Sequence, residues 1–178
     1  KGIADEGNKI SMATKTKDSG QKIVHIALVR VRGDANLNPH VRKTMKLLKL
    51  YAKTTCIIVS NPEDFLGMIR RVKDFTAFGE ISPETFVKLL QKRGRLAGGK
   101  ALTDDYLKQK LKLDMKQFAD EFFAFKQKLE SIPGVKTFFR LHPPIGGFER
   151  GGIKKNYAEG GALGYRGKDI NKLIERMI

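Results

Sequence analysis

Residues 23–31 read IVHIALVRV, and this apolar stretch decides how the rest of the chain is arranged. Its aliphatic and β-branched residues form a nearly continuous run with little alternation, which is typical of a strand covered on both faces. The run therefore predicts the central strand of a sheet. His25 lies inside it, and because no second ligand is spaced to help it, we interpret His25 as a sheet residue and not as a metal ligand.

Helix and strand signals alternate after this strand. Asn38-Pro39 and Asn61-Pro62 each join a capping residue to a proline at the first helical position, so each predicts a helix start. Residues 55–59 predict a second strand, and residues 75–81 predict a third, which Gly79 weakens. The resulting order is β-α-β-α-β, a small sheet covered by two helices.

The second half of the chain predicts further helices and one short strand. Ser82-Pro83 predicts a helix start, Gly94 its end, and Asp114 with Gln117 forms a capping box that opens another helix. Cys56 has apolar neighbours and is interpreted as a core residue. Helical spacing predicts three buried stripes: Val41, Met45, Leu48 and Ala52; Phe118, Phe122, Phe125 and Leu129; and Ile170, Leu173, Ile174 and Met177.

These signals place the chain in the α+β class and divide it into three parts. Residues 1–21 are polar and small, and they predict a mobile N-terminal arm. Residues 22–82 form the β-α-β-α-β core. Residues 83–178 form a helical extension that ends in a long basic Gly/Pro loop and a last helix.

The charge of the chain is strongly positive and lies in blocks. There are 35 Lys and Arg residues against 19 Asp and Glu residues, a formal net charge of +16. Residues 21–60 carry eight basic and one acidic side chain, residues 91–100 carry four basic and none acidic, and residues 131–178 carry nine and four. A merely soluble surface intersperses the two signs. Blocks of positive charge indicate a polyanionic partner.

The stretch 138–165 reads FFRLHPPIGGFERGGIKKNYAEGGALGY. Its first residues predict a short strand, after which two prolines forbid a helix. Seven glycines follow, which deny the segment a core of its own and permit close approach to a partner. We expect residues 140–166 to be mobile in the free protein and to become ordered on RNA. The alternatives are a permanently disordered basic loop, or one in which Phe148 and Tyr157 fold back onto the helical extension.

The residue patterns that would indicate several other functions are absent from the sequence. The segment Gly94 to Lys100 resembles a nucleotide-binding loop, but Ala101 stands where a hydroxyl should hold magnesium, and a helix precedes the loop instead of a strand. The three histidines show no metal-ligand spacing, and no serine nucleophile elbow is present. A single cysteine excludes an internal disulfide and fits a reducing compartment. No apolar run approaches the length of a membrane span.

Several motifs resemble one known family. Arg30-Val31-Arg32-Gly33, Val72-Lys73-Asp74 and Phe78-Gly79-Glu80-Ile81 resemble the core of the universal large-subunit ribosomal protein family called L thirty. Arg93-Gly94-Arg95-Leu96 and Phe139-Arg140-Leu141-His142-Pro143-Pro144 resemble its long archaeal and eukaryotic form, called L seven in eukaryotes. The resemblance spans about residues 22–178. It implies a ferredoxin-like core with a helical extension, no cofactor and no catalysis.

The resemblance also implies a function and its partners. A structural constituent of the large ribosomal subunit is expected, a cytoplasmic ribonucleoprotein component of translation that binds rRNA near the 5S RNA region, beside neighbouring ribosomal proteins. The alternative is an assembly factor of the same family that acts on pre-rRNA. No membrane and no small-molecule substrate is expected. The candidate RNA-binding residues are Arg30, Arg32, His40, Arg42, Lys43, Lys46, Arg93, Arg95, Lys100, Arg140, His142, Pro143, Gly146, Gly147, Phe148, Arg150, Lys154, Lys155, Tyr157, Tyr165 and Arg166.

Overall fold

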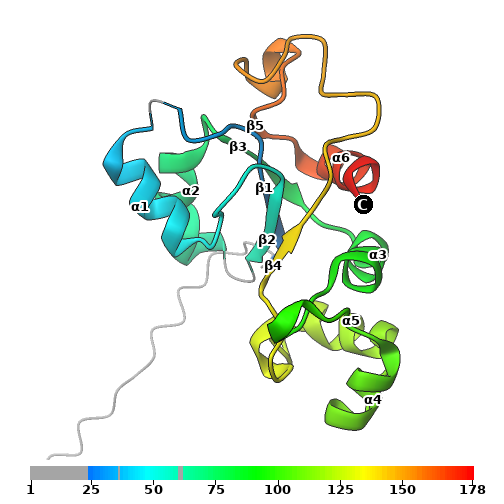
Figure 1. Cartoon of the computed structure of the whole chain (residues 1–178). Helices are drawn as coiled ribbons and strands as arrows, with labels where there is room; N and C mark the ends of the chain where they lie inside the picture. Colours follow the sequence, from blue (N-terminus) through cyan, green and yellow to red (C-terminus); the bar gives the residue numbers. More distant parts are fainter. Residues whose placement is uncertain (1–23, 36, 60–61) are drawn as a thin grey trace, which may run out of the picture.

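The computed structural model describes residues 24–35, 37–59 and 62–178, and it contains a five-stranded mixed sheet (Figure 1). The predicted N-terminal arm and the expected cap at Asn61 lie outside these residues. The strands are β1 (Ile26–Arg30), β2 (Thr55–Val59), β3 (Thr76–Glu80), β4 (Phe138–Arg140) and β5 (Gly164–Tyr165), in the order β4-β2-β1-β3-β5. Only the β3–β5 pair is parallel. The predicted central position of β1 is confirmed.

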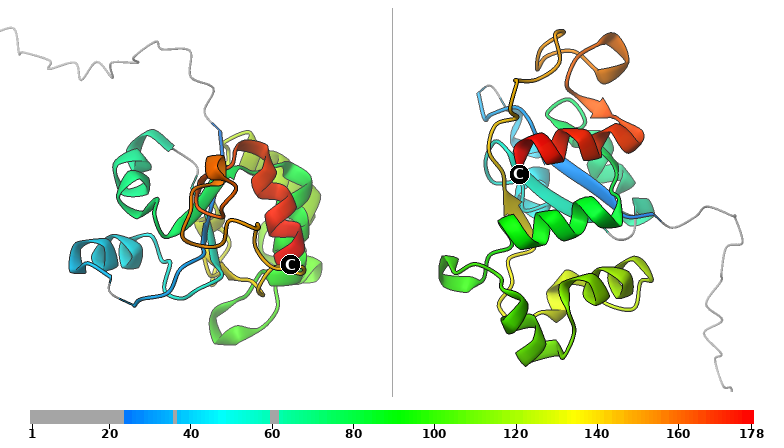
Figure 2. Two further views of the ribbon diagram at one scale, coloured as in Figure 1. Left: turned by 90° about the horizontal axis from the view of Figure 1, so that it is seen from above. Right: turned by 90° about the vertical axis from the view of Figure 1, so that its right-hand side faces the viewer.

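Helices cover both faces of the sheet, with α1 and α2 on one side and α3 and α6 on the other (Figure 2). The helices are α1 (Pro39–Leu47), α2 (Pro62–Val72), α3 (Pro83–Arg93), α4 (Asp104–Leu111), α5 (Met115–Phe123) and α6 (Ile170–Met177). Short 3-10 turns lie at η1 (Ala97–Gly99), η2 (Leu129–Ser131), η3 (Tyr157–Glu159) and η4 (Gly167–Asp169). No helix in the described ranges is both long and apolar enough to cross a membrane.

Because strand side chains alternate between faces, β1 contributes to two separate cores. Leu28 packs with Met45, Leu48, Ile69 and Val72 beneath α1 and α2. On the other face lie Ala27 and Val29, which belong to a larger cluster with Cys56, Phe86, Leu89, Phe118, Phe122, Leu173 and Ile174. Strands β4 and β5, which lie beyond residue 83, complete the sheet at its two edges.

Local capping signals account for the starts of α1, α3 and α5. The Asn38 side chain accepts a hydrogen bond from the backbone N–H of His40 (2.9 Å), and Ser82 caps α3 through the N–H of Thr85 (3.3 Å). Both sides of the predicted capping box between Asp114 and Gln117 are present at α5. These caps satisfy amide groups that the first helical turn leaves without partners.

Two predicted stripes end earlier than their spacing suggests. Helix α1 stops at Leu47, and Lys49 takes a left-handed conformation (φ +57°), so Ala52 lies off the helix and is exposed. Helix α5 likewise stops at Phe123, and Phe125 is left-handed (φ +57°) and 43% exposed. A left-handed residue redirects the chain, so helical spacing no longer applies beyond it.

Candidate RNA-binding surface

Several loops meet at one end of the sheet, which we call the loop end. The register pairs Thr55 with Arg140 and Arg30 with Thr76, so the ends of β1 and β4 lie beside the starts of β2 and β3. Thr54 bridges them, because its N–H donates to Arg30 O (2.8 Å) and its carbonyl accepts from Leu141 N (3.0 Å). The β1–α1 loop and the loop of residues 141–163 both leave the sheet at this end (Figure 1).

Arg30 holds the loop end together from inside the protein. Its side chain is 2% exposed, and its guanidinium donates to Arg32 O (2.9 Å), Leu50 O (2.9 Å) and Tyr51 O (3.1 Å), and to Asp34 Oδ1 (2.6 Å). These acceptors come from two different loops. Arg30 was expected to contact RNA, but its donors are occupied by the protein, so we exclude it from the proposed surface.

Helix α1 presents the densest group of basic side chains at this end. The side chains of His40, Arg42, Lys43 and Lys46 are all exposed. Asp34 lies among them, and its pKa is lowered, first by the hydrogen bond from Arg30 and further by the positive charges of Arg42 and Lys46. Arg32 is half-buried over the Phe75 ring (4.7 Å) and donates to Asp74 O (3.1 Å).

Residues 141–147 are held against the C-terminal turn of α6. His142 N donates to Met177 O (2.9 Å), and Arg176 Nε donates to Ile145 O (2.9 Å). Gly146 and Gly147 have φ angles of +78° and +74°, conformations that glycine adopts without strain. The turn they form leaves Ile145 81% exposed. Arg140, His142 and Pro143 are exposed as well, so they remain available to a partner.

An internal ion pair closes the remainder of the loop. Arg166 is 5% exposed, and its two terminal nitrogens donate to both carboxylate oxygens of Glu149 (2.7 and 2.5 Å). The Tyr157 ring lies 4.7 Å from the Arg166 guanidinium, and its hydroxyl donates to Asp169 (3.0 Å). Phe148 packs against the larger core. These contacts fit the alternative in which Phe148 and Tyr157 fold back onto the protein.

Exposed basic residues on this closed loop face outward. Arg150, Lys154 and Lys155 are exposed, as is the Tyr165 side chain, which donates weakly to Glu80 (3.3 Å). Arg166 was also a candidate RNA contact, but Glu149 and the carbonyl of Ala162 (2.8 Å) occupy its donors. We therefore exclude Arg166, together with Arg30, from the proposed surface.

The basic block at residues 91–100 lies away from the loop end. Arg95 O accepts from Lys136 N (2.9 Å), which places this block beside the chain that leads into β4. Arg140 lies four positions beyond Lys136, a span of about 13 Å if the chain is extended. Arg93 is half-buried and donates to the main-chain oxygen of Ile178 (2.6 Å), whereas Lys100 is exposed. The structure thus brings two of the three basic blocks together.

Tyr51 is a surface residue that the sequence analysis missed. It follows α1 in the chain, is 52% exposed, and contacts Phe138 edge to face with 5.5 Å between ring centroids. A lone tyrosine directly after a basic helix was the available signal, because exposed aromatic rings can stack on unpaired bases.

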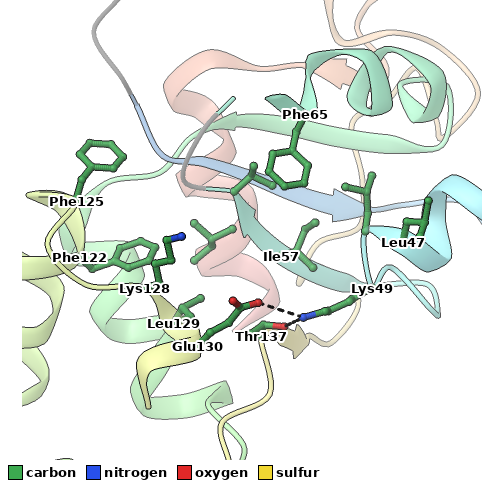
Figure 3. A pocket seen from close by; sticks show the side chains of 13 residues that line it. Leu47, Lys49, Ile57, Phe65, Phe122, Phe125, Lys128, Leu129, Glu130 and Thr137 are labelled. Atoms are coloured by element: carbon green, nitrogen blue, oxygen red, sulfur yellow. Dashed lines mark hydrogen bonds and ion pairs between the residues drawn. The ribbon is translucent and has the colours of Figure 1, made fainter. Parts of the chain in front are cut away.

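A second surface feature is apolar. An open pocket of 640 Å³ lies between the end of α1, β2 and η2, and Figure 3 shows Ile57, Phe65 and Phe122 pointing into it. Two lysines line it, Lys49 and Lys128, and Lys49 donates to Thr137 (2.8 Å) and lies 3.6 Å from Glu130. Because most of its lining is apolar and the carboxylate of Glu130 also faces it, the pocket is poorly suited to phosphate.

Two buried titratable residues, His25 and Cys56, are packed among apolar and aromatic side chains. His25 is stacked between the rings of Phe122 (4.2 Å) and Phe125 (4.4 Å), and burial lowers its pKa. Burial raises the pKa of Cys56 to about 12, so its thiol is protonated at neutral pH and is a poor nucleophile. No cluster of three metal-ligating side chains occurs within residues 24–35, 37–59 and 62–178.

The fold and this surface together define a small, strongly basic α+β protein. Its sequence matches the family described as Ribosomal protein L30p/L7e over residues 26–75. It is 46% identical to large ribosomal subunit protein uL30 of Methanopyrus kandleri, over 83% of this chain and 100% of that protein. The uL30 proteins of Methanococcus vannielii (44%, covering 85% and 98%) and Hyperthermus butylicus (43%, covering 91% and 95%) are also similar. The chain belongs to the L30p/L7e family of ribosomal proteins.

Proposed function

We propose that this protein is a structural constituent of the large ribosomal subunit, and that it binds folded rRNA with the loop end of its sheet. The observation that carries the proposal is the gathering of exposed basic side chains on loops that are distant in sequence. Arg42, Lys43 and Lys46 of α1 share this end with Arg140 and with the outer side of the 141–163 loop. Phosphate contacts of this kind position a protein on RNA.

The location of the bound RNA is a finer part of the proposal. Family resemblance favours rRNA near the 5S RNA, with neighbouring ribosomal proteins as further partners and the cytoplasm as the place of action. Arg93, Arg95 and Lys100 form a separate group, which we propose to contact a second rRNA segment or a neighbouring protein.

Salt dependence of rRNA binding tests which surface faces the phosphates. Each phosphate contact adds roughly 0.7–0.9 to the steepness with which the logarithm of the binding constant falls against the logarithm of the salt concentration. Replacing Arg42, Lys43 and Lys46 with Gln should flatten the slope for a large-subunit rRNA fragment. The control replaces Lys110, Lys116 and Lys126 with Gln, since these lysines are exposed around α4 and α5 and removing them changes the net charge equally. Equal slopes for the two triple variants would contradict the proposed surface.

Co-sedimentation tests the role in the mature subunit. The tagged protein should remain with large subunits after a high-salt wash, because many contacts must then break together. Presence on immature particles alone would instead identify an assembly factor.

A further inference from the structure

We propose that the pocket beside α1 takes one unpaired guanine base of RNA, with the donor edge of the base on Asp34 and its phosphate on Arg42 and Lys46. This inference rests on the proposed function and specifies one contact within it. The pocket has a volume of 350 Å³, near the small end of the range for ligand pockets, so it suits a single nucleotide. Its lining residues are Arg30, Asp34, Arg42, Met45, Lys46, Leu50 and Tyr51.

Asp34 is unexpected at this position. It is the one acidic residue among residues 21–60, and 59% of its side chain is exposed between basic groups. A carboxylate here repels phosphate, so it weakens the general attraction of the surface for RNA. Its lowered pKa keeps it charged at neutral pH. Balancing the buried charge of Arg30 is one role for Asp34, but that role requires only one of its oxygens.

The carboxylate is held in place before any ligand arrives. Arg30 donates to Oδ1 of Asp34 (2.6 Å), and three backbone carbonyls fix the orientation of the Arg30 guanidinium. Among the described residues, Oδ2 of Asp34 accepts no hydrogen bond. An ionised carboxylate has several acceptor sites and no donor, so Asp34 presents a fixed acceptor edge to the pocket.

The rest of the pocket suits a flat base with a phosphate attached. Met45 and Leu50 line the bottom of the pocket but are almost fully buried, so its accessible surface comes mainly from Asp34, Arg42, Lys46 and Tyr51. The exposed Tyr51 ring offers a face on which a base can stack. Arg42 and Lys46 lie close enough to Asp34 to lower its pKa, and both are exposed to bind the phosphate of the same nucleotide.

Guanine is the base that this acceptor edge selects. Its Watson–Crick edge carries two adjacent donors, N1–H and the N2 amino group, which match the two oxygens of a carboxylate. Adenine and cytosine place an acceptor beside their amino group, and uracil flanks its single donor with two carbonyls. Each of the other bases therefore sets an acceptor against the carboxylate.

Binding of short single-stranded RNAs to the full chain tests the site. The probes are fluorescent uridine heptamers whose central base is G, A, C or U, measured by anisotropy at physiological ionic strength. We expect the G oligomer to bind about five-fold or more tighter than the A oligomer, the lower limit for a bidentate base contact. Asp34→Asn should abolish this preference, because an amide presents one acceptor and one donor in place of two acceptors. Lys46→Gln should weaken all four oligomers by a similar factor and keep the preference.

A second variant tests the site even if Asp34→Asn misfolds. Tyr51→Leu leaves the Arg30–Asp34 pair intact and should weaken binding of the G oligomer more than that of the U oligomer. Equal affinity of the unmodified protein for all four oligomers would overturn the guanine site. If the protein still bound an rRNA fragment in a salt-dependent way, the proposed function would stand. Absence of binding to any RNA, the rRNA fragment included, would overturn both.

Discussion

Arg166 and Glu149 form a two-pronged ion pair across the loop that joins β4 to β5, with both Arg166 Nη to Glu149 Oε distances at or below 2.7 Å. The Arg166 side chain in this pair is almost fully buried, and that of Glu149 is 24% exposed. Arg166 N also donates to Phe78 O (2.9 Å), so the pair attaches the loop to the sheet. The Arg166–Glu149 ion pair and the hydrogen bonds beside it therefore fix the conformation of this glycine-rich segment.

The Arg166–Glu149 pair should make the stability of the loop depend on pH. The hydrogen bond from Arg166 lowers the pKa of Glu149 in the folded protein. The stabilisation is therefore complete above the ordinary glutamate pKa of 4.5 and is lost as the pH falls through the lowered folded value. Glu149→Gln should reduce the free energy of unfolding at neutral pH, and the difference from the unmodified protein should shrink as the pH falls below 4.5. A difference that did not change with pH would contradict this assignment.

Backbone amides inside the loop should exchange slowly in the free protein. Gly151 N donates to Gly160 O (3.0 Å), Tyr157 N to Leu163 O (2.8 Å) and Ala162 N to Gly152 O (3.0 Å). The expectation from composition was rapid exchange that slows on RNA, but these hydrogen bonds supply protection without a partner. Hydrogen exchange without RNA should show these three amides slower than that of Lys154. Uniformly fast exchange across residues 141–163 would restore the original expectation.

Phe122 and Phe125 should differ sharply in their contribution to stability, although both belong to the predicted stripe. Phe122 is 1% exposed and stacks on Phe86 (4.6 Å), whereas Phe125 lies beyond the end of α5. We expect Phe122→Ala to cost about 3–5 kcal/mol in the free energy of unfolding. Phe125→Ala should cost clearly less. Denaturant unfolding measures both values, and equal losses would contradict the expected difference between the two side chains.

Gly79 should not tolerate a side chain, whereas Gly67 should. A Cβ at residue 79 of β3 would overlap the carbonyl oxygen of Gly167, where the chain enters α6. We expect Gly79→Ala to destabilise the protein by about 1–3 kcal/mol, as overpacking generally does. A Cβ at residue 67 of α2 meets nothing within 4 Å, and Gly67→Ala should stabilise the helix by roughly 0.5–1 kcal/mol. Thermal unfolding of the two variants should shift in opposite directions.

Much of the fold could be predicted because its causes are local. The uninterrupted apolar run at β1 reports burial on both faces, and the capping residues Asn38, Ser82 and Asp114 act on amides within the next turn. Every described member of the last predicted stripe, from Ile170 to Met177, is buried in α6. Such signals depend on residues a few positions apart, so they can be read without knowledge of the rest of the chain.

The sequence by itself determined the β-α-β-α-β order, the two-sided core and the excess of positive charge, because spacing and charge are properties of neighbouring residues. Only the tertiary structure decided which basic residues remain accessible. Arg30 and Arg166 resemble other arginines in the sequence, yet both are buried because distant carbonyls and a carboxylate occupy their donors. A guanidinium can leave water only where such acceptors converge. The positions of these acceptors depend on how β1, α1 and the loop of residues 141–163 pack together, so no pattern of neighbouring residues predicts them.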